Sequence, residues 1–462
     1  MKLRDEPRRR RPWIVPVLLL PVVAAVLLAT LRTGSAPEIS IDPELPGFGR
    51  RTPVDVLLAA GGRGLGSVKV FLSQGEETRL IEERDYVARA PWAFWGEHTV
   101  ADVLELEVGS ETVQGLQEGE ATLRVESEPP RTWLRRPAAV VADLTLPVLL
   151  RPPSLSLLST QHYPTQGGAE AVVYRVGESS VRDGVMVGDL WFPGVVVPTS
   201  AAGEKIGLFA VPFDHDDSTT IRLMAEDAVG NVTRASFVDR FFPRAFQTDD
   251  IDVSEGFMAK VVPEILANTP ELVDLGDLVE NYVAINRDLR QANATTLRQL
   301  AAVSPSEILW RKSFVTMKNA QVMSAFADRR SYRYEGRKID RQDHLGFDLA
   351  SVRRASVPAA NSGRVVLAEY FGIYGNAVVI DHGLGLMSLY GHLSEVQVEK
   401  GQSIERGQPV GRTGETGLAA GDHLHFTMLL RGEAVNPLEW WDAAWIRDRL
   451  VRKLGPALPF ED

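Results

Sequence analysis

Residues 423–426 read His-Leu-His-Phe, and this run carries the clearest fold signal in the last third of the chain. In a β-strand, side chains at positions i and i+2 project from the same face, so both imidazoles can point into one site. Short β-type runs with glycine turns surround it at 363–367, 376–380 and 407–411. The pattern predicts a β-rich domain that holds a histidine site.

Histidines are concentrated in this region, since five of the eight lie between His344 and His425. His344 and Asp348 stand four residues apart, and His392 lies in the run Tyr-Gly-His-Leu-Ser. Two histidines and one carboxylate are a known zinc ligand set that leaves a fourth position for water. Zinc would lower the pKa of that water and polarise a substrate carbonyl. One spare histidine can take the water's proton, and another can hydrogen-bond the oxyanion or the leaving amine.

The motifs that contain His344 and Asp348, His392, and His423 and His425 occur in this order within glycine-rich β sequence. Together they resemble the lysostaphin-like (LytM-type) zinc metalloendopeptidases, which cut peptidoglycan peptides. The resemblance covers roughly residues 320–440 and includes the runs at 401–402 and 414–417. It implies a C-terminal lysostaphin-like peptidase domain. In that domain the scissile peptide would lie extended over the metal, in a β-rich groove.

The same resemblance implies a role for each histidine of the three motifs. His344, Asp348 and His425 would be the ligands of one Zn²⁺ per chain, and His392 and His423 would be the unligated catalytic pair. The chain contains no cysteine, so any metal must be held by histidines and carboxylates.

Two positions depart from the family pattern. A tyrosine thought to stabilise the transition state lies six residues before the first ligand in some members, where this chain has Lys338. Tyr332 and Tyr334 lie nearby. With His382, which we expect at a turn or groove wall, they are candidate groove or transition-state contacts. Thr427 replaces an acidic residue that is common after the His-Leu-His-Phe run, and neither change touches the metal set.

The first 31 residues predict a membrane anchor. Residues 1–12 form a basic tail with six basic and two acidic side chains, and residues 13–31 carry no charge. About 20 apolar residues cross a bilayer as a helix, and a basic flank stays in the cytoplasm. We therefore expect a single-pass protein of the inner (cytoplasmic) membrane, with its C-terminal bulk in the periplasm or outside the cell. A cleaved signal peptide is the alternative.

The fold class is predicted to be multidomain and mostly β. Dense short β-type runs, such as 54–58, 68–72, 121–125 and 221–225, predict two immunoglobulin-like β-sandwiches. The simplest interpretation is that both domains are passive spacers, since a fold alone implies no function. The expected order is a linker at 32–51, spacers at 52–150 and 151–245, a helical connector at 250–304, the peptidase domain at 310–440 and a C-terminal amphipathic helix and tail at 441–462.

The connector shows helix start signals at Ser254 and at Thr269-Pro270. The spacing of four apolar residues places them on one helical face, formed by Leu278, Tyr282, Ile285 and Leu289. Because the connector directly precedes the peptidase domain, we predict that this face shields the substrate groove. The alternative is that the helices brace the domain from behind.

These signals together predict a membrane-anchored zinc metalloendopeptidase that hydrolyses peptidoglycan cross-links or stems, with a D-alanyl–diaminopimelate cross-link as the expected target. The alternatives are a non-catalytic regulator that activates another cell-wall hydrolase, and a structural envelope scaffold. A net charge of −11 argues against a nucleic-acid partner. The expected partners are the peptidoglycan peptide, the membrane through the N-terminal helix, and an envelope protein at the β-sandwich or helical regions.

Overall fold

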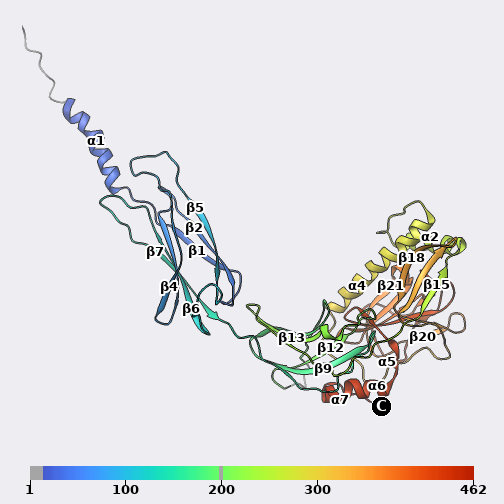
Figure 1. The fold of residues 1–462 in the computed structure, drawn as a ribbon. Coiled ribbons are helices and arrows are strands. Elements are labelled where there is room, and N and C mark those ends of the chain that lie inside the picture. Colours follow the sequence, from blue (N-terminus) through green and yellow to red (C-terminus); the bar gives the residue numbers. More distant parts are fainter. Residues whose placement is uncertain (1–13, 197–200, 462) are drawn as a thin grey trace, which may run out of the picture. The chain divides into compact units, whose positions relative to one another are not determined.

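The computed structural model describes residues 14–196 and 201–461, and Figure 1 shows their elements. The chain divides into two compact units. The first extends to Pro152 and includes Glu226–Val232, and the second comprises Pro153–Ala225 and the chain from Thr233 onward. Strands dominate both units, which confirms a multidomain, mostly β chain.

Helix α1, Ile14–Leu31, is the first described element. Among the described residues, no helix is long and apolar enough to cross a membrane. The anchor predicted at 13–31 stays a prediction. The predicted basic tail at 1–12 lies outside the described residues.

The first unit contains two antiparallel sheets around one apolar core. One sheet has the order β1-β2-β5, with β1 at Glu38–Pro43, β2 at Thr52–Ala59 and β5 at Ala101–Val108. The other has the order β4-β3-β6-β7, with bounds Glu77–Asp85, Ser67–Gln74, Gly119–Glu128 and Val140–Val148.

Strands β2, β3 and β6 confirm the runs predicted at 54–58, 68–72 and 121–125. The linker prediction at 32–51 is wrong in part, because β1 lies inside it. Ile39 and Ile41 alternate along β1 and pack against the core, so this segment belongs to the sheet. The immunoglobulin-like topology stays a prediction.

The second unit begins with seven strands in two further sheets. They are β8 Leu155–Leu157, β9 Ala169–Val176, β10 Ser180–Val187, β11 Leu190–Pro193, β12 Glu204–Ala210, β13 Ile221–Asp227 and β14 Val232–Ala235. The sheet orders are β11-β10-β13-β14 and β12-β9-β8. Tyr174 and Phe209 share one apolar core with Trp440 near the end of the chain. The region predicted as a separate spacer at 151–245 therefore packs with the C-terminal part of the chain as one unit.

The connector contains three α-helices and a π-helical turn: α2 Glu255–Asn268, α3 Leu278–Ala284, the turn Ile285–Leu289 and α4 Arg290–Ala302. Ser254 caps α2 as predicted, since its hydroxyl accepts a hydrogen bond from the Phe257 amide at 3.2 Å. The second predicted start is wrong. Thr269 ends α2, and α3 begins at Leu278 because the carboxylate of Asp277 accepts hydrogen bonds from the first free amides.

The C-terminal part is built on an eight-stranded sheet with the order β16-β19-β27-β23-β22-β21-β25, and β28 pairs with β27. Figure 1 labels β21 of this sheet. The bounds are Gln321–Ser324, Phe347–Ala350, Leu424–Leu430, Leu386–Gly391, Asn376–Asp381, Gly363–Tyr370 and Ser403–Ile404, with Glu433–Val435 for β28. Every residue of the central strands β23 and β27 is buried. Leu297 and Ala301 of α4 pack on one face of this sheet, which positions the connector.

Two small sheets complete this part. One contains β15 Thr248–Asp252, β17 Asp328–Tyr334 and β18 Arg337–His344, and the other contains β20 Ser356–Pro358, β26 Pro409–Arg412 and β24 Glu395–Val396.

The C-terminal region is a broken helical run rather than the single amphipathic helix predicted at 441–462. It comprises α5 Pro437–Trp441, α6 Ala443–Ile446, a π-helical turn Arg447–Val451 and α7 Arg452–Leu454. Asp442 interrupts it with an extended backbone and caps α6. The apolar side chains Trp440, Ile446 and Leu450 of this run are fully buried and pack in the core of their own unit.

Candidate metal centre and cleft

The pairing of three neighbouring strands brings the sequence motifs together. In the antiparallel ladder, Asp348 of β19 lies opposite His425 of β27. On the other side of β27, Gly391 at the end of β23 also pairs with His425, so His392 follows directly beside it. His344 ends β18 only four residues before Asp348. Residues far apart in sequence therefore meet at one end of the sheet.

His344, Asp348 and His425 form a compact donor cluster. His344 Nε2 lies 2.9 Å from Asp348 Oδ1 and 3.1 Å from His425 Nδ1, and His425 Nδ1 lies 3.0 Å from Asp348 Oδ1. Ligands about 2.0–2.2 Å from a tetrahedral zinc ion lie roughly 3.3–3.5 Å apart, so a small expansion of this cluster admits the ion. The two histidines and the carboxylate fit a zinc site, and they are the predicted ligands.

Each histidine of the cluster is oriented by a hydrogen bond from its other ring nitrogen. His344 Nδ1 lies 2.9 Å from the Ala325 carbonyl, so Nδ1–H can donate and leave Nε2 free. His425 Nε2 lies 3.0 Å from the Thr427 hydroxyl, which itself donates to the Leu345 carbonyl at 2.9 Å. This leaves Nδ1 of His425 for the metal. Thr427 thus orients a ligand at the position where the family commonly has an acidic residue.

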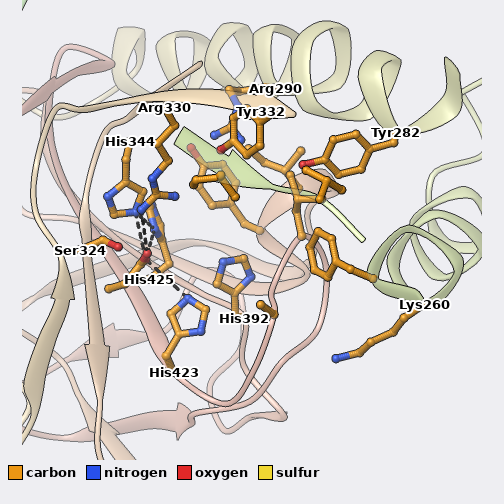
Figure 2. Close-up of a pocket in the computed structure, with 18 of the residues that line it drawn as sticks. Lys260, Tyr282, Arg290, Ser324, Arg330, Tyr332, His344, His392, His423 and His425 are labelled. Atoms are coloured by element: carbon orange, nitrogen blue, oxygen red, sulfur yellow. Dashed lines mark hydrogen bonds and ion pairs between the residues drawn. The ribbon is translucent and has the colours of Figure 1, made fainter. Parts of the chain in front are cut away.

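The other two histidines lie beside this cluster. The ring centres of His392 and His423 are 4.8 Å apart, and His392 lies 5.8 Å from His425. His392 Nδ1 donates to the Thr416 carbonyl at 2.8 Å, and His423 Nδ1 donates to the Gly421 carbonyl at 2.8 Å. In both rings Nε2 then faces the site, and Nε2 of His423 lies 3.5 Å from Asp348 Oδ1. Figure 2 shows them next to His425.

Burial and neighbouring charges give these histidines different pKa values. Burial lowers the pKa of His425 to about 4, which favours the neutral ring that binds metal. Burial first, and then the neighbouring His423 and His425, lower the pKa of His392 well below its usual range. Burial also opposes protonation of His423, but its contact with Asp348 outweighs this and raises the pKa of His423. His392 is therefore neutral at neutral pH, whereas His423 takes up a proton more readily.

The carboxyl group of Asp348 is kept ionised. Burial raises its pKa, but the surrounding histidines, His344 first, outweigh that effect and hold the pKa well below its usual range. Arg330 adds a contact on the other side, where its Nη2 lies 3.3 Å from Asp348 Oδ2. One carboxylate oxygen thus faces the histidines and the other faces a guanidinium.

All five site residues line one cleft of about 590 Å³ (Figure 2). The opposite wall comes from the connector and from the strand before it, with Val253, Phe257, Lys260, Tyr282 and Arg290. Part of the connector therefore lines the cleft, while α4 packs on the sheet. A volume of this size accommodates a short peptide or a small ligand. The connector therefore forms one wall of the cleft but does not fill it.

The three candidate groove contacts have different positions. Tyr332 lines the cleft, whereas Tyr334 and His382 are not among its lining residues. His382 is fully buried in the core, where its ring bonds to the Ser362 carbonyl at 2.7 Å and to the Ser388 hydroxyl at 2.8 Å. Its polar atoms are satisfied there, so it does not contact the groove.

Sequence reasoning missed several lining residues. Arg330 and Tyr374 lie in no motif, and Arg290 comes from a helix that was read only for its apolar face. The sequence signal that could have found Arg330 is the alternation in β17, where Arg330 and Tyr332 are two residues apart and therefore share a face.

The segment that contains most of these site residues is similar to known proteins. Residues 342–437 match the model of peptidase family M23. The chain is 41% identical over 96 residues to the peptidoglycan DD-endopeptidase ShyA of Vibrio cholerae, which covers 21% of this chain and 22% of that protein. It is 37% identical over 95 residues to the murein hydrolase activator EnvC of Escherichia coli, covering 21% and 23%.

Among solved structures, a zinc-containing peptidase from Vibrio cholerae is 32% identical, covers 29% of this chain and 40% of that one, and has a TM-score of 0.25. The chain spans about a quarter of the length of the curated relatives it matches. The likeness therefore concerns the domain with the histidine cluster.

Proposed function

We propose that this chain, whose C-terminal domain is a peptidase family M23 domain of the LytM type, is a zinc metalloendopeptidase that hydrolyses peptidoglycan peptides. The observation that carries the proposal is the convergence of His344, Asp348 and His425 in a cleft beside two histidines that are not needed as ligands. Three protein ligands leave a coordination position open, which is the arrangement of a catalytic zinc site.

Zinc in this site would polarise the scissile carbonyl and lower the pKa of a water molecule. The protein side chains divide the remaining work. The neutral His392, held by the Thr416 carbonyl, offers Nε2 as a proton acceptor. His423, held by the Gly421 carbonyl, offers its Nε2 as a hydrogen-bond donor to developing negative charge or to the leaving amine.

A second candidate is a domain that binds peptides and activates another hydrolase. It is favoured by the likeness to EnvC, whose name describes an activator. The complete ligand set favours the enzyme, because an activator has no need of three metal-binding side chains that orient one another.

The location of the substrate puts this activity outside the cytoplasmic membrane, and we extend the proposal to that compartment. The anchor predicted at 13–31 stays a prediction. Retention of the full-length chain in membranes washed with high salt and carbonate tests it, and release into the wash would contradict it.

The enzyme proposal is tested by digesting purified peptidoglycan with the full chain and analysing the products by mass spectrometry. We expect new peptide termini at the D-alanyl–diaminopimelate cross-link. Asp348→Ala should give none, whereas His215→Ala, which replaces a histidine outside the cleft, should digest at the normal rate. Intact substrate after treatment with the zinc-loaded chain would favour the activator.

A further inference from the structure

Three cationic side chains line the cleft: Lys260, Arg290 and Arg330 (Figure 2). Lys260 Nζ is paired with Glu415 at 2.8 Å, and Arg330 with Asp348 at 3.3 Å. Arg290 differs from both. Across residues 14–196 and 201–461, no carboxylate lies within ion-pair distance of its guanidinium.

Arg290 is held in place by uncharged groups. Its Nε donates to the Asn286 carbonyl at 3.0 Å, and its Nη2 donates to Asn286 Oδ1 at 2.7 Å. Asn286 is fully buried, and its amide donates to Asp340 Oδ2 at 2.8 Å. This chain of contacts fixes the guanidinium and leaves other N–H groups of the fork without a charged acceptor.

The surroundings of Arg290 favour an anionic partner. The side chain is half-buried, and Tyr282, Tyr332 and Tyr374 line the same cleft. Poor access to water makes an unpaired charge unfavourable and strengthens a charge-assisted hydrogen bond to an anion. A planar guanidinium matches a carboxylate in two parallel hydrogen bonds.

The proposed substrate supplies such an anion. In a D-alanyl–diaminopimelate cross-link, the carbon that carries the scissile nitrogen also carries a free carboxylate. That carboxylate must lie near the metal ligands when the bond lies over them. Arg330, in contact with Asp348, marks the near edge of this position, and Arg290 projects into the cleft from the helical wall.

We propose that Arg290, with Arg330 beside it, forms a carboxylate-binding subsite for the residue on the amine side of the scissile bond. This inference rests on the proposed function, because that function supplies the substrate. Both arginines lie outside the segment 342–437 that matches the family, so the connector and β17 provide the subsite. The connector then has a role in substrate selection.

The test uses two soluble cross-linked peptides that differ only in this group, a free carboxylate or a carboxamide. Their binding is measured by calorimetry to the zinc-loaded full chain carrying His392→Ala, so that turnover does not interfere. We expect the carboxylate to bind roughly 10- to 100-fold more tightly, the usual size of a charge-assisted hydrogen bond in a cleft. Adding Arg290→Met should remove most of that preference, and Arg290→Lys should keep part of it.

Arg287→Met is the matched control, because Arg287 is an exposed arginine of the same helical region whose partner is Asp288. It should keep the full preference. An unchanged preference in Arg290→Met, or none in the parent chain, would overturn the subsite.

Cleavage of both peptides by the wild-type chain separates the two proposals. Hydrolysis without a binding preference leaves the enzyme standing and removes the subsite. A binding preference without hydrolysis leaves the subsite and removes the enzyme.

Discussion

Loosening the connector should have opposite effects on a small and a large substrate. Ile285 is fully buried in the cluster that joins the connector to Tyr332 and Ile373 at the cleft. Ile285→Ala should destabilise this packing by about 2–5 kcal/mol. Each 1.4 kcal/mol is a factor of ten, so the open population of the connector should rise roughly 30- to 4,000-fold.

A short peptide fits the cleft as it stands, and it uses the connector wall for binding. Its KM should therefore rise in Ile285→Ala. The connector wall slows the entry of an intact cell wall more than that of a short peptide, so hydrolysis of the cell wall should become at least several-fold faster, as the shielding prediction requires. Release of dye from labelled peptidoglycan and hydrolysis of a soluble peptide are the two assays.

The control for Ile285→Ala is Leu123→Ala, which creates a similar cavity in the core of the first unit. It should leave both rates unchanged. Hydrogen exchange of the connector amides verifies that Ile285→Ala has loosened them. Loosened amides with an unchanged or slower digestion of cell wall would refute the shielding role.

Three further predictions concern catalysis and stability. His392→Ala and His423→Ala should each lower kcat by roughly 10²–10⁴ while zinc content, measured by atomic absorption, is retained; a metal-free His423→Ala would mean that its role and that of His425 are exchanged. Burial raises the pKa of Glu439 from its usual 4.5 to about 8. Between these two pH values, the folded chain therefore keeps a proton on Glu439 that the unfolded chain has lost. Stability to urea should therefore fall as pH rises from about 5 to 8, and Glu439→Gln should flatten this slope; equal slopes would exclude Glu439 as its source. Lys453→Met should destabilise the second unit by about 3–5 kcal/mol, because it leaves the buried Glu170 without its closest cation, and a loss under 1 kcal/mol in urea unfolding would contradict this.

The donor cluster of His344, Asp348 and His425 was predictable, because histidines and carboxylates at these spacings rarely occur together by chance. His423 and His425 alternate in one strand, and His344 and Asp348 are local in sequence. What sequence does not specify is the strand pairing that places Asp348 opposite His425, because register depends on contacts between segments about 77 positions apart.

The failures have local physical causes. Thr269-Pro270 matches a helix start, but the chain continues without helix to Asp277, whose carboxylate caps two amides and fixes the real start. The segment 32–51 is rich in proline and glycine, which hid the short alternation of Ile39 and Ile41 in β1. The segment 151–245 packs onto the C-terminal part of the chain through a core that includes Tyr174, Phe209 and Trp440. No local sequence pattern predicts a core shared by residues so far apart in the chain.

That Arg290 lines the cleft could not be predicted from the sequence for a related reason. Its helix was read through its apolar face, and periodicity tells which residues are buried but not which cleft a polar neighbour enters. The packing of α4 on the sheet brings this arginine into the cleft that His344, Asp348 and His425 also line.

Restoration of activity by metal tests the central claim most directly. The full chain is stripped with a chelator, dialysed and titrated with zinc while cleavage of purified peptidoglycan is followed by mass spectrometry. We predict that cleavage returns in proportion to zinc and saturates at one ion per chain, and that His344→Ala neither binds the ion nor recovers. Full cleavage by the stripped chain, or one tightly bound zinc in His344→Ala, would contradict the assignment.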